Sequence, residues 1–189
     1  MTDRTLERAP RTRAELDAGV DEIRRSPWDA GTIELIVVRP GEDVRTVVDE
    51  ARFDLIRGVA GDTWSTRPSS RLGHPDPEAQ VTLMNARAAA LICGPRDRWP
   101  LAGDQLFVDL DLSGDSLPAG TRLQLGTAVL EVTTKPHTGC AKFSARFGAD
   151  ALRFSNSEVG RELNLRGIHA RVVEAGVAQR GSTITRLLP

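Results

Sequence analysis

The chain has 189 residues, enough to bury the core of one domain of ordinary size. Its formal net charge of −1 argues against a strongly basic nucleic-acid platform and against a polybasic membrane anchor. The first residues, MTDRTLERAPRTR, are too polar for a secretory signal, and no apolar run approaches bilayer length. We therefore expect a cytoplasmic protein that binds neither nucleic acid nor membrane.

A helix is predicted over residues 12–24. Thr12 and Glu15 have the spacing of a capping box, and apolar residues follow on one helix face at Leu16, Val20 and Ile23. A proline ends this helix, and the β-branched run at residues 31–40 is typical of a strand. We divide the chain into an N-terminal helical extension, residues 1–30, and a main domain, residues 31–189.

The next part of the chain alternates strand and loop signals. Residues 44–56 are predicted to be mostly strand, although helix signals compete, and residues 65–80 are rich enough in Ser, Pro and Gly to be an exposed loop. Residues 81–84 form a predicted strand, and Asn85 is a good N-cap for the alanine-rich helix that follows. Cys93 ends that helix, where a small buried side chain is the better interpretation.

The clearest strand signal is at residues 106–112, where apolar residues alternate with Phe107 and two aspartates. In TRLQLGTAVLEV, a two-residue turn at Gly126-Thr127 would place Leu125 opposite Ala128 and Leu123 opposite Leu130. Ser157 is a candidate helix cap, and a strand at residues 168–174 is expected to turn through GVAQRG into STITRLL. These short strands predict an α+β, mainly β fold: a closed or nearly closed β-barrel with peripheral helices.

The loop KPHTGCAKFSARF, residues 135–147, follows one of these strands and carries Cys140. His137, Lys142 and Arg146 lie close enough in sequence to favour the thiolate, the form that attacks sulfur and ligates soft metals. The alternative is a small hydrophobic side chain among solvated charges. We select Cys140 and His137 as catalytic candidates, and a reducing compartment favours free thiols over a pair with Cys93.

Other polar residues carry weaker signals. Asp62 and Asp104 each follow glycine, which is more typical of turns than of paired catalytic carboxylates. His74 and His169 are interpreted as structural, and no zinc spacing, phosphate loop or Cys-x-x-Cys pair occurs. Candidate contacts to an anionic group are Lys142, Arg166 and, in the 65–80 loop, Arg71, with a solvated surface role as the alternative for each.

The chain resembles the MOSC domain, named after the C-terminal part of molybdenum cofactor sulfurases. The resemblance runs in order through GVAGDTW, QVTLMNARAAALI, LAGDQLFVDLDLS, GTRLQLGTAVLEVTTKPHTGCAKF and LRGIHARVVEAGVAQRGSTI, from residue 58 to residue 184. It implies a β-rich barrel, and Cys140 matches the cysteine with which the family is proposed to carry sulfur or bind a molybdenum–pterin cofactor. Many members have Gly-Glu-Asn where this chain has Gly103-Asp104-Gln105, which puts a polar site role there in doubt.

Two functions follow from the resemblance. In the first, Cys140 ligates the molybdenum of an anionic pterin, and the protein acts as an oxidoreductase on small nitrogen or sulfur compounds with a separate electron donor. In the second, Cys140 is a metal-free persulfide carrier between a sulfur donor and an acceptor protein. A binding module with an inert cysteine is a third possibility. Full sulfurases also have a pyridoxal-phosphate domain, for which 189 residues leave no room, so no pyridoxal phosphate is expected in this chain.

Overall fold

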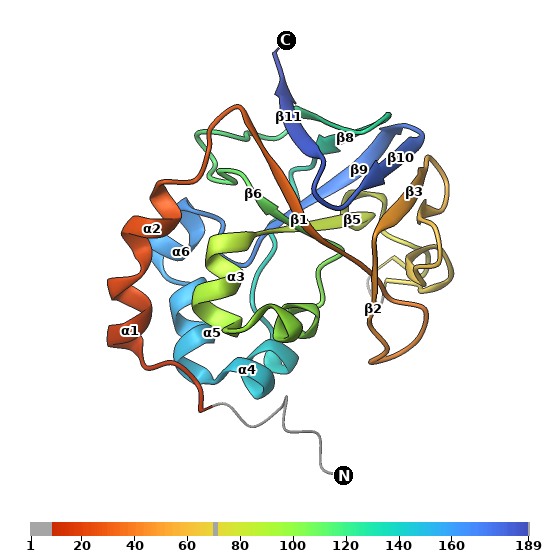
Figure 1. Cartoon of the computed structure of the whole chain (residues 1–189). Helices are drawn as coiled ribbons and strands as arrows, with labels where there is room; N and C mark the ends of the chain where they lie inside the picture. Colours follow the sequence, from red (N-terminus) through yellow and green to blue (C-terminus); the bar gives the residue numbers. More distant parts are fainter. Residues whose placement is uncertain (1–8, 70–71, 189) are drawn as a thin grey trace.

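The computed structural model describes residues 9–69 and 72–188, and its centre is a closed, mixed β-barrel (Figure 1). Seven strands follow one another around it in the order β11, β7, β8, β9, β5, β6, β1, and β1 pairs again with β11. Neighbours are antiparallel except β5 and β6. The barrel strands are β1 (Ala30–Val38), β5 (Val81–Asn85), β6 (Leu106–Asp109), β7 (Arg122–Leu125), β8 (Ala128–Val132), β9 (Ile168–Glu174) and β11 (Thr183–Leu187). The predicted α+β, mainly β barrel is confirmed.

The remaining described strands lie outside the closed ring. One of them extends the sheet from β1, and the others form a small three-stranded sheet in the order β10, β3, β4. Their bounds are β2 (Thr46–Val48), β3 (Glu50–Asp54), β4 (Gly58–Val59) and β10 (Gly176–Gln179). The strand prediction for residues 44–56 is therefore confirmed by β2 and β3.

The helices gather on one side of the barrel, as Figure 1 shows. Their bounds are α1 (Arg13–Ala18), α2 (Val20–Arg24), α3 (Ala86–Cys93), α4 (Ala141–Phe147), α5 (Ala149–Ser155) and α6 (Glu158–Glu162). Short 3-10 segments are η2 (Trp64–Thr66), η3 (Pro77–Ala79) and η4 (Arg96–Ala102). None of the helices in the described ranges is long and apolar enough to cross a membrane.

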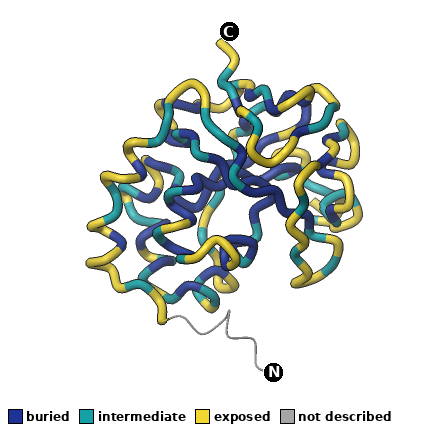
Figure 2. Tube along the Cα trace, in the orientation of Figure 1, coloured by how far each residue is buried: buried dark blue, intermediate teal, exposed yellow. Residues whose placement is uncertain are grey.

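The strands supply two hydrophobic cores because their side chains alternate between faces. On β6, Leu106 and Val108 point into the barrel, whereas Phe107 packs in the layer between barrel and helices. Leu16 and Ile23, from the predicted amphipathic helix, are buried in that second core. Figure 2 shows the buried stretches concentrated in the strands and the inner helix faces, with the exposed positions on the outer loops.

Local signals at several helix ends are confirmed. Thr12 and Glu15 form the capping box, although Gly19 divides the predicted helix into α1 and α2. Asn85 caps α3 by accepting the N–H of Ala88 at 2.9 Å, which leaves its amide nitrogen free to donate to the carbonyl of Leu110.

The predicted hairpin is confirmed in its register, with Leu125 opposite Ala128 and Leu123 opposite Leu130. The prediction for the end of the chain was wrong in one respect. The segment expected to turn directly between two strands contains β10, which leaves the barrel to pair with β3. Gly176 permits this path, because a Cβ there would lie 2.4 Å from the carbonyl carbon of Thr127.

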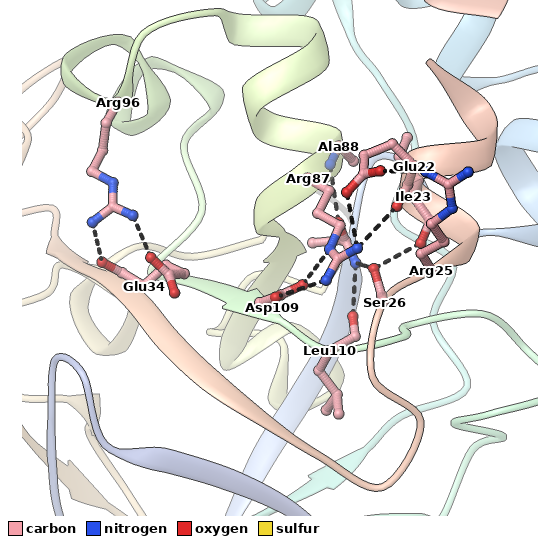
Figure 3. A network of polar contacts seen from close by, with 11 residues as sticks. Glu22, Ile23, Arg25, Ser26, Glu34, Arg87, Ala88, Arg96, Asp109 and Leu110 are labelled. Carbon is pink, nitrogen blue, oxygen red and sulfur yellow. Dashed lines mark hydrogen bonds and ion pairs between the residues drawn. The ribbon is translucent and has the colours of Figure 1, made fainter. Parts of the chain in front are cut away.

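A polar network ties the helical layer to the barrel (Figure 3). Arg87 of α3 donates to Asp109 of β6 at 2.7 Å and also pairs with Glu22 of α2 at 3.0 Å. Arg96 forms a second ion pair, with Glu34 of β1. Because each pair joins a helix or 3-10 segment to a different element, the network fixes how the helices sit on the sheet.

Candidate functional site

Cys140 stands at the N-cap position of α4, and its side chain is exposed. The preceding peptide is held by Asn156, whose side-chain oxygen accepts the N–H of Gly139 at 3.0 Å. A Cβ at Gly139 would lie 2.7 Å from Leu152, so the small residue lets this loop lie close to α5. The fold therefore presents the Cys140 thiol to solvent on an anchored loop.

His137 lies three residues earlier but points into a different environment. Its ring is largely buried and packs on the ring of His169, with 4.3 Å between centroids. Burial, reinforced by the positive charge of Arg166, holds the pKa of His137 well below its usual value. Among the described residues, no hydrogen bond, ion pair or ring contact joins His137 to Cys140. The structure thus places His137 beside the loop of Cys140 without showing the direct pairing that the sequence suggested.

A buried ion pair lies behind His137. Asp104 is fully buried and accepts from Nη1 of Arg166 at 2.6 Å, while Nη2 of Arg166 donates to the carbonyl of Ala102 at 2.8 Å. The second Asp104 oxygen is 3.5 Å from Nδ1 of His137, and neither atom has a hydrogen-bond partner. The Arg166 guanidinium also lies over the ring of Phe143 in α4, at 5.0 Å. Arg166 is therefore an internal link between the barrel and α4.

The other predicted anion contacts are placed differently. The Lys142 side chain is 58% exposed and lies 3.5 Å from Glu42 and 3.7 Å from Asp43. Arg71 lies outside the described residues. Gln105, in the position where the chain departs from the Gly-Glu-Asn pattern, is buried and accepts the N–H of Thr82 at 2.8 Å.

The sequence interpretation missed a cluster of three arginines, Arg39, Arg45 and Arg146, which we call the guanidinium cluster. Arg39 donates to the carboxylate of Asp62 through Nε at 2.7 Å and Nη2 at 3.0 Å, and its Nη1 donates to the carbonyl of Gly103. Arg146 of α4 donates to Asp43 at 2.8 Å. No local pattern distinguishes these arginines, because Arg39 and Arg45 lie in the connection between β1 and β2, whereas Arg146 comes from α4, far along the chain.

Arg45 is the member of the cluster whose charge is least compensated. Its pKa is lowered by burial and by the nearby charges of Arg146 and Arg39. Its Nε is buried without a hydrogen-bond partner, and its one side-chain bond runs to the carbonyl of Val44. An anion placed here would supply the missing acceptor and reduce the repulsion between the guanidiniums.

These residues fit an anionic cofactor with a soft metal. The exposed Cys140 offers sulfur, the ligand type that soft metals prefer, and the guanidinium cluster offers donors to an anionic group. Groups of three or more His, Cys, Asp or Glu suited to a metal ion are absent from the part of the chain that the structure describes. A separate hollow of about 260 Å³ lies beside His137 and His169, and its lining includes neither Cys140 nor the guanidinium cluster.

No family model and no curated protein sequence matches the chain. Solved structures do share its fold. The YuaD protein from Bacillus subtilis is 19% identical, with a TM-score of 0.61 over 82% of this chain and 94% of that one. YiiM from Escherichia coli is 16% identical, with a TM-score of 0.54 over 84% of this chain and 70% of that one. YiiM from Geobacillus stearothermophilus is 17% identical, with a TM-score of 0.51 over 84% and 75%. At these identities the likeness establishes a common fold.

Proposed function

We propose that this chain is a MOSC-type protein that binds a molybdenum–pterin cofactor and acts as an oxidoreductase on small nitrogen or sulfur compounds. The Cys140 thiolate is the metal ligand, and the guanidinium cluster contacts the anionic group of the pterin. The ordered sequence resemblance and the shared fold support the class. The single observation that carries the proposal is Arg45, a partly buried guanidinium that lacks a carboxylate partner and lies beside two others.

The positions of Cys140 and Arg146 suit one extended ligand. They lie at opposite ends of α4, six residues apart, which corresponds to about 9 Å along the helix axis. Arg146 is held in place by Asp43 and by the carbonyl of Leu101. A ligand bound at both ends would therefore be oriented by residues whose own positions are fixed.

When bound, the cofactor would supply the redox chemistry, and the chain would position it. Cys140 would hold the metal, and Arg39 and Arg45 would orient the anionic group. His137, whose pKa is held well below its usual value, would stay neutral at the hollow that it lines with His169. Electrons would come from a separate donor.

The exposure of Cys140 favours a second candidate, a persulfide carrier. A protein partner can reach this thiol, whereas Cys93 is buried and its pKa is raised by burial. In this case the Cys140 thiolate attacks the outer sulfur of a persulfide on the donor protein, and the donor thiolate leaves. An acceptor nucleophile then takes that sulfur and releases the Cys140 thiolate, so Cys140 is the single working thiol of the chain.

Metal and pterin content distinguishes the candidates. We expect protein made in a host that produces the cofactor to carry molybdenum and pterin, and Cys140→Ser to lose most of the metal because a hydroxyl is a poor soft-metal ligand. Arg45→Gln should lower the pterin content. Arg25→Gln, which removes the same charge at the C-cap of α2, should leave the molybdenum and pterin contents unchanged.

Each outcome has a clear interpretation. Equal molybdenum contents in the wild type and in Cys140→Ser would show that Cys140 is not a ligand of the metal. An added sulfur mass on Cys140 in metal-free protein would support the carrier instead. Metal-free protein without added sulfur would overturn both candidates.

A further inference from the structure

Arg52, Arg57 and Arg67 differ from all other arginines of the described residues. Their guanidiniums make no hydrogen bond, ion pair or ring contact, whereas every other arginine within residues 9–69 and 72–188 makes at least one. All three residues are exposed. Their charges are therefore available to a ligand.

These three arginines line two adjoining hollows. Arg52 and Arg57 border a hollow of about 500 Å³ beside β3 and β4. Arg67 borders a hollow of about 240 Å³, and Thr66 lines both. Ser65 adds a hydroxyl to the larger hollow. We call this joined surface the arginine groove. A total volume of this size suits a small molecule.

Two of the three carboxylates that line the arginine groove have cationic partners outside it. Asp54 accepts the N–H groups of Ile56 and Arg57, which lower its pKa. Both oxygens of Asp62 accept from Arg39. Glu42, in the smaller hollow, lies 3.5 Å from the ammonium of Lys142. Asp54 keeps its negative charge, which acts on Arg57. Because the other two carboxylates face Arg39 and Lys142, the charges of Arg52 and Arg67 remain without a carboxylate partner.

We propose that the arginine groove binds a small molecule bearing more than one phosphate group. Guanidiniums bind phosphate oxygens through paired N–H donors, and three unpaired cations call for a polyvalent anion. The groove shares none of its arginines with the guanidinium cluster, and the two adjoin at Asp62, which lines the groove and accepts from Arg39. It stands independently of the function proposed for Cys140.

Calorimetric titration with inorganic pyrophosphate at low salt tests the proposal. We expect saturable binding to the wild type and about five- to tenfold weaker binding to Arg52→Gln, Arg57→Gln and Arg67→Gln. Arg25→Gln is the matched control, because Arg25 is the exposed C-cap of α2, and α2 lies on the opposite side of the molecule from β3 (Figure 1). Its affinity should equal that of the wild type.

Two further titrations distinguish binding in the arginine groove from binding at the guanidinium cluster and from unspecific attraction of anions. Arg45→Gln removes a donor of the guanidinium cluster, so the binding that Arg52→Gln weakens should persist in Arg45→Gln. Citrate at the same concentration tests whether phosphate geometry matters beyond charge, and it should bind more weakly than pyrophosphate. The proposal is overturned if pyrophosphate does not saturate, if Arg25→Gln weakens binding as much as the groove variants, or if citrate binds equally well.

Discussion

His137 and His169 are stacked as neutral rings beside a buried ion pair. Burial is the main cause of the low pKa of His137, and the charge of Arg166 adds to it. Burial also lowers the pKa of His169, although the carbonyl of Lys135 partly offsets this. In the folded protein, His137 and His169 therefore bind a proton less readily than the same side chains do in the unfolded chain.

The free energy of unfolding should fall as the pH drops below about 6.5, the ordinary histidine pKa. Below that value the unfolded state binds more protons than the folded state, which costs up to about 1.4 kcal/mol per pH unit for each histidine. Above it the contribution of the neutral rings is fully present. Urea unfolding between about pH 8 and about pH 5 should show a shallower decline for His137→Gln than for the wild type. Equal slopes would show that His137 does not titrate differently on folding.

The sequence predicted that Cys140 lies in a loop after a strand, but it predicted few of the contacts that the residues around this loop make. Cys93 was expected to be buried and is, because helix periodicity places it on the apolar side. Asp104 was expected in a turn, and Gly103 does adopt a left-handed conformation there. Its ion pair with Arg166 could not be predicted, because the partner comes from a segment far along the chain and the composition offers many arginines.

At the scale of elements, local pairing was predictable and remote pairing was not. The β7–β8 register follows from one turn and a short apolar alternation. β10 gives no comparable signal, since its partner β3 is distant in sequence and its first residue is a glycine. β5 likewise runs parallel to β6, a connection that no hairpin rule anticipates.

Gly167→Ala should disturb the point where the chain enters β9. Gly167 has a φ of 107°, and an added Cβ would lie 2.2 Å from the carbonyl oxygen of Leu83 and 3.2 Å from Nδ1 of His137. We expect a loss of about 2 kcal/mol or more of stability, because backbone of β5 has to move. Urea unfolding measures this loss. Gly181→Ala is the control for the left-handed strain alone, since an added Cβ there meets nothing within 4 Å; an equal loss in both variants would exclude a steric effect at β5.

At the scale of the whole molecule, β1 and β6 each contribute to both cores. On β1, Ile33 and Ile36 face the barrel interior, whereas Leu35 and Val37 face the helices. A change in one core is therefore transmitted through strands that the other core needs.

Leu16→Ala tests whether the N-terminal helices fold together with the barrel. Leu16 is fully buried, so the substitution should lower the free energy of unfolding by about 2–5 kcal/mol. We expect one transition, coincident by circular dichroism and tryptophan fluorescence, that Leu123→Ala in the barrel core shifts in the same way. A separate early transition in Leu16→Ala alone would mean that residues 1–30 form an independent extension.

The pairing of β11 with β1 also bears on how the protein is made. β1 is synthesised before every other barrel strand, yet Ala30 in β1 pairs with Thr185 in β11, the barrel strand that is synthesised last. Until translation reaches β11, the N-terminal end of β1 keeps an open edge, the kind of surface on which nascent chains associate wrongly. Barrel closure consequently waits for β11, however early the other strands have paired.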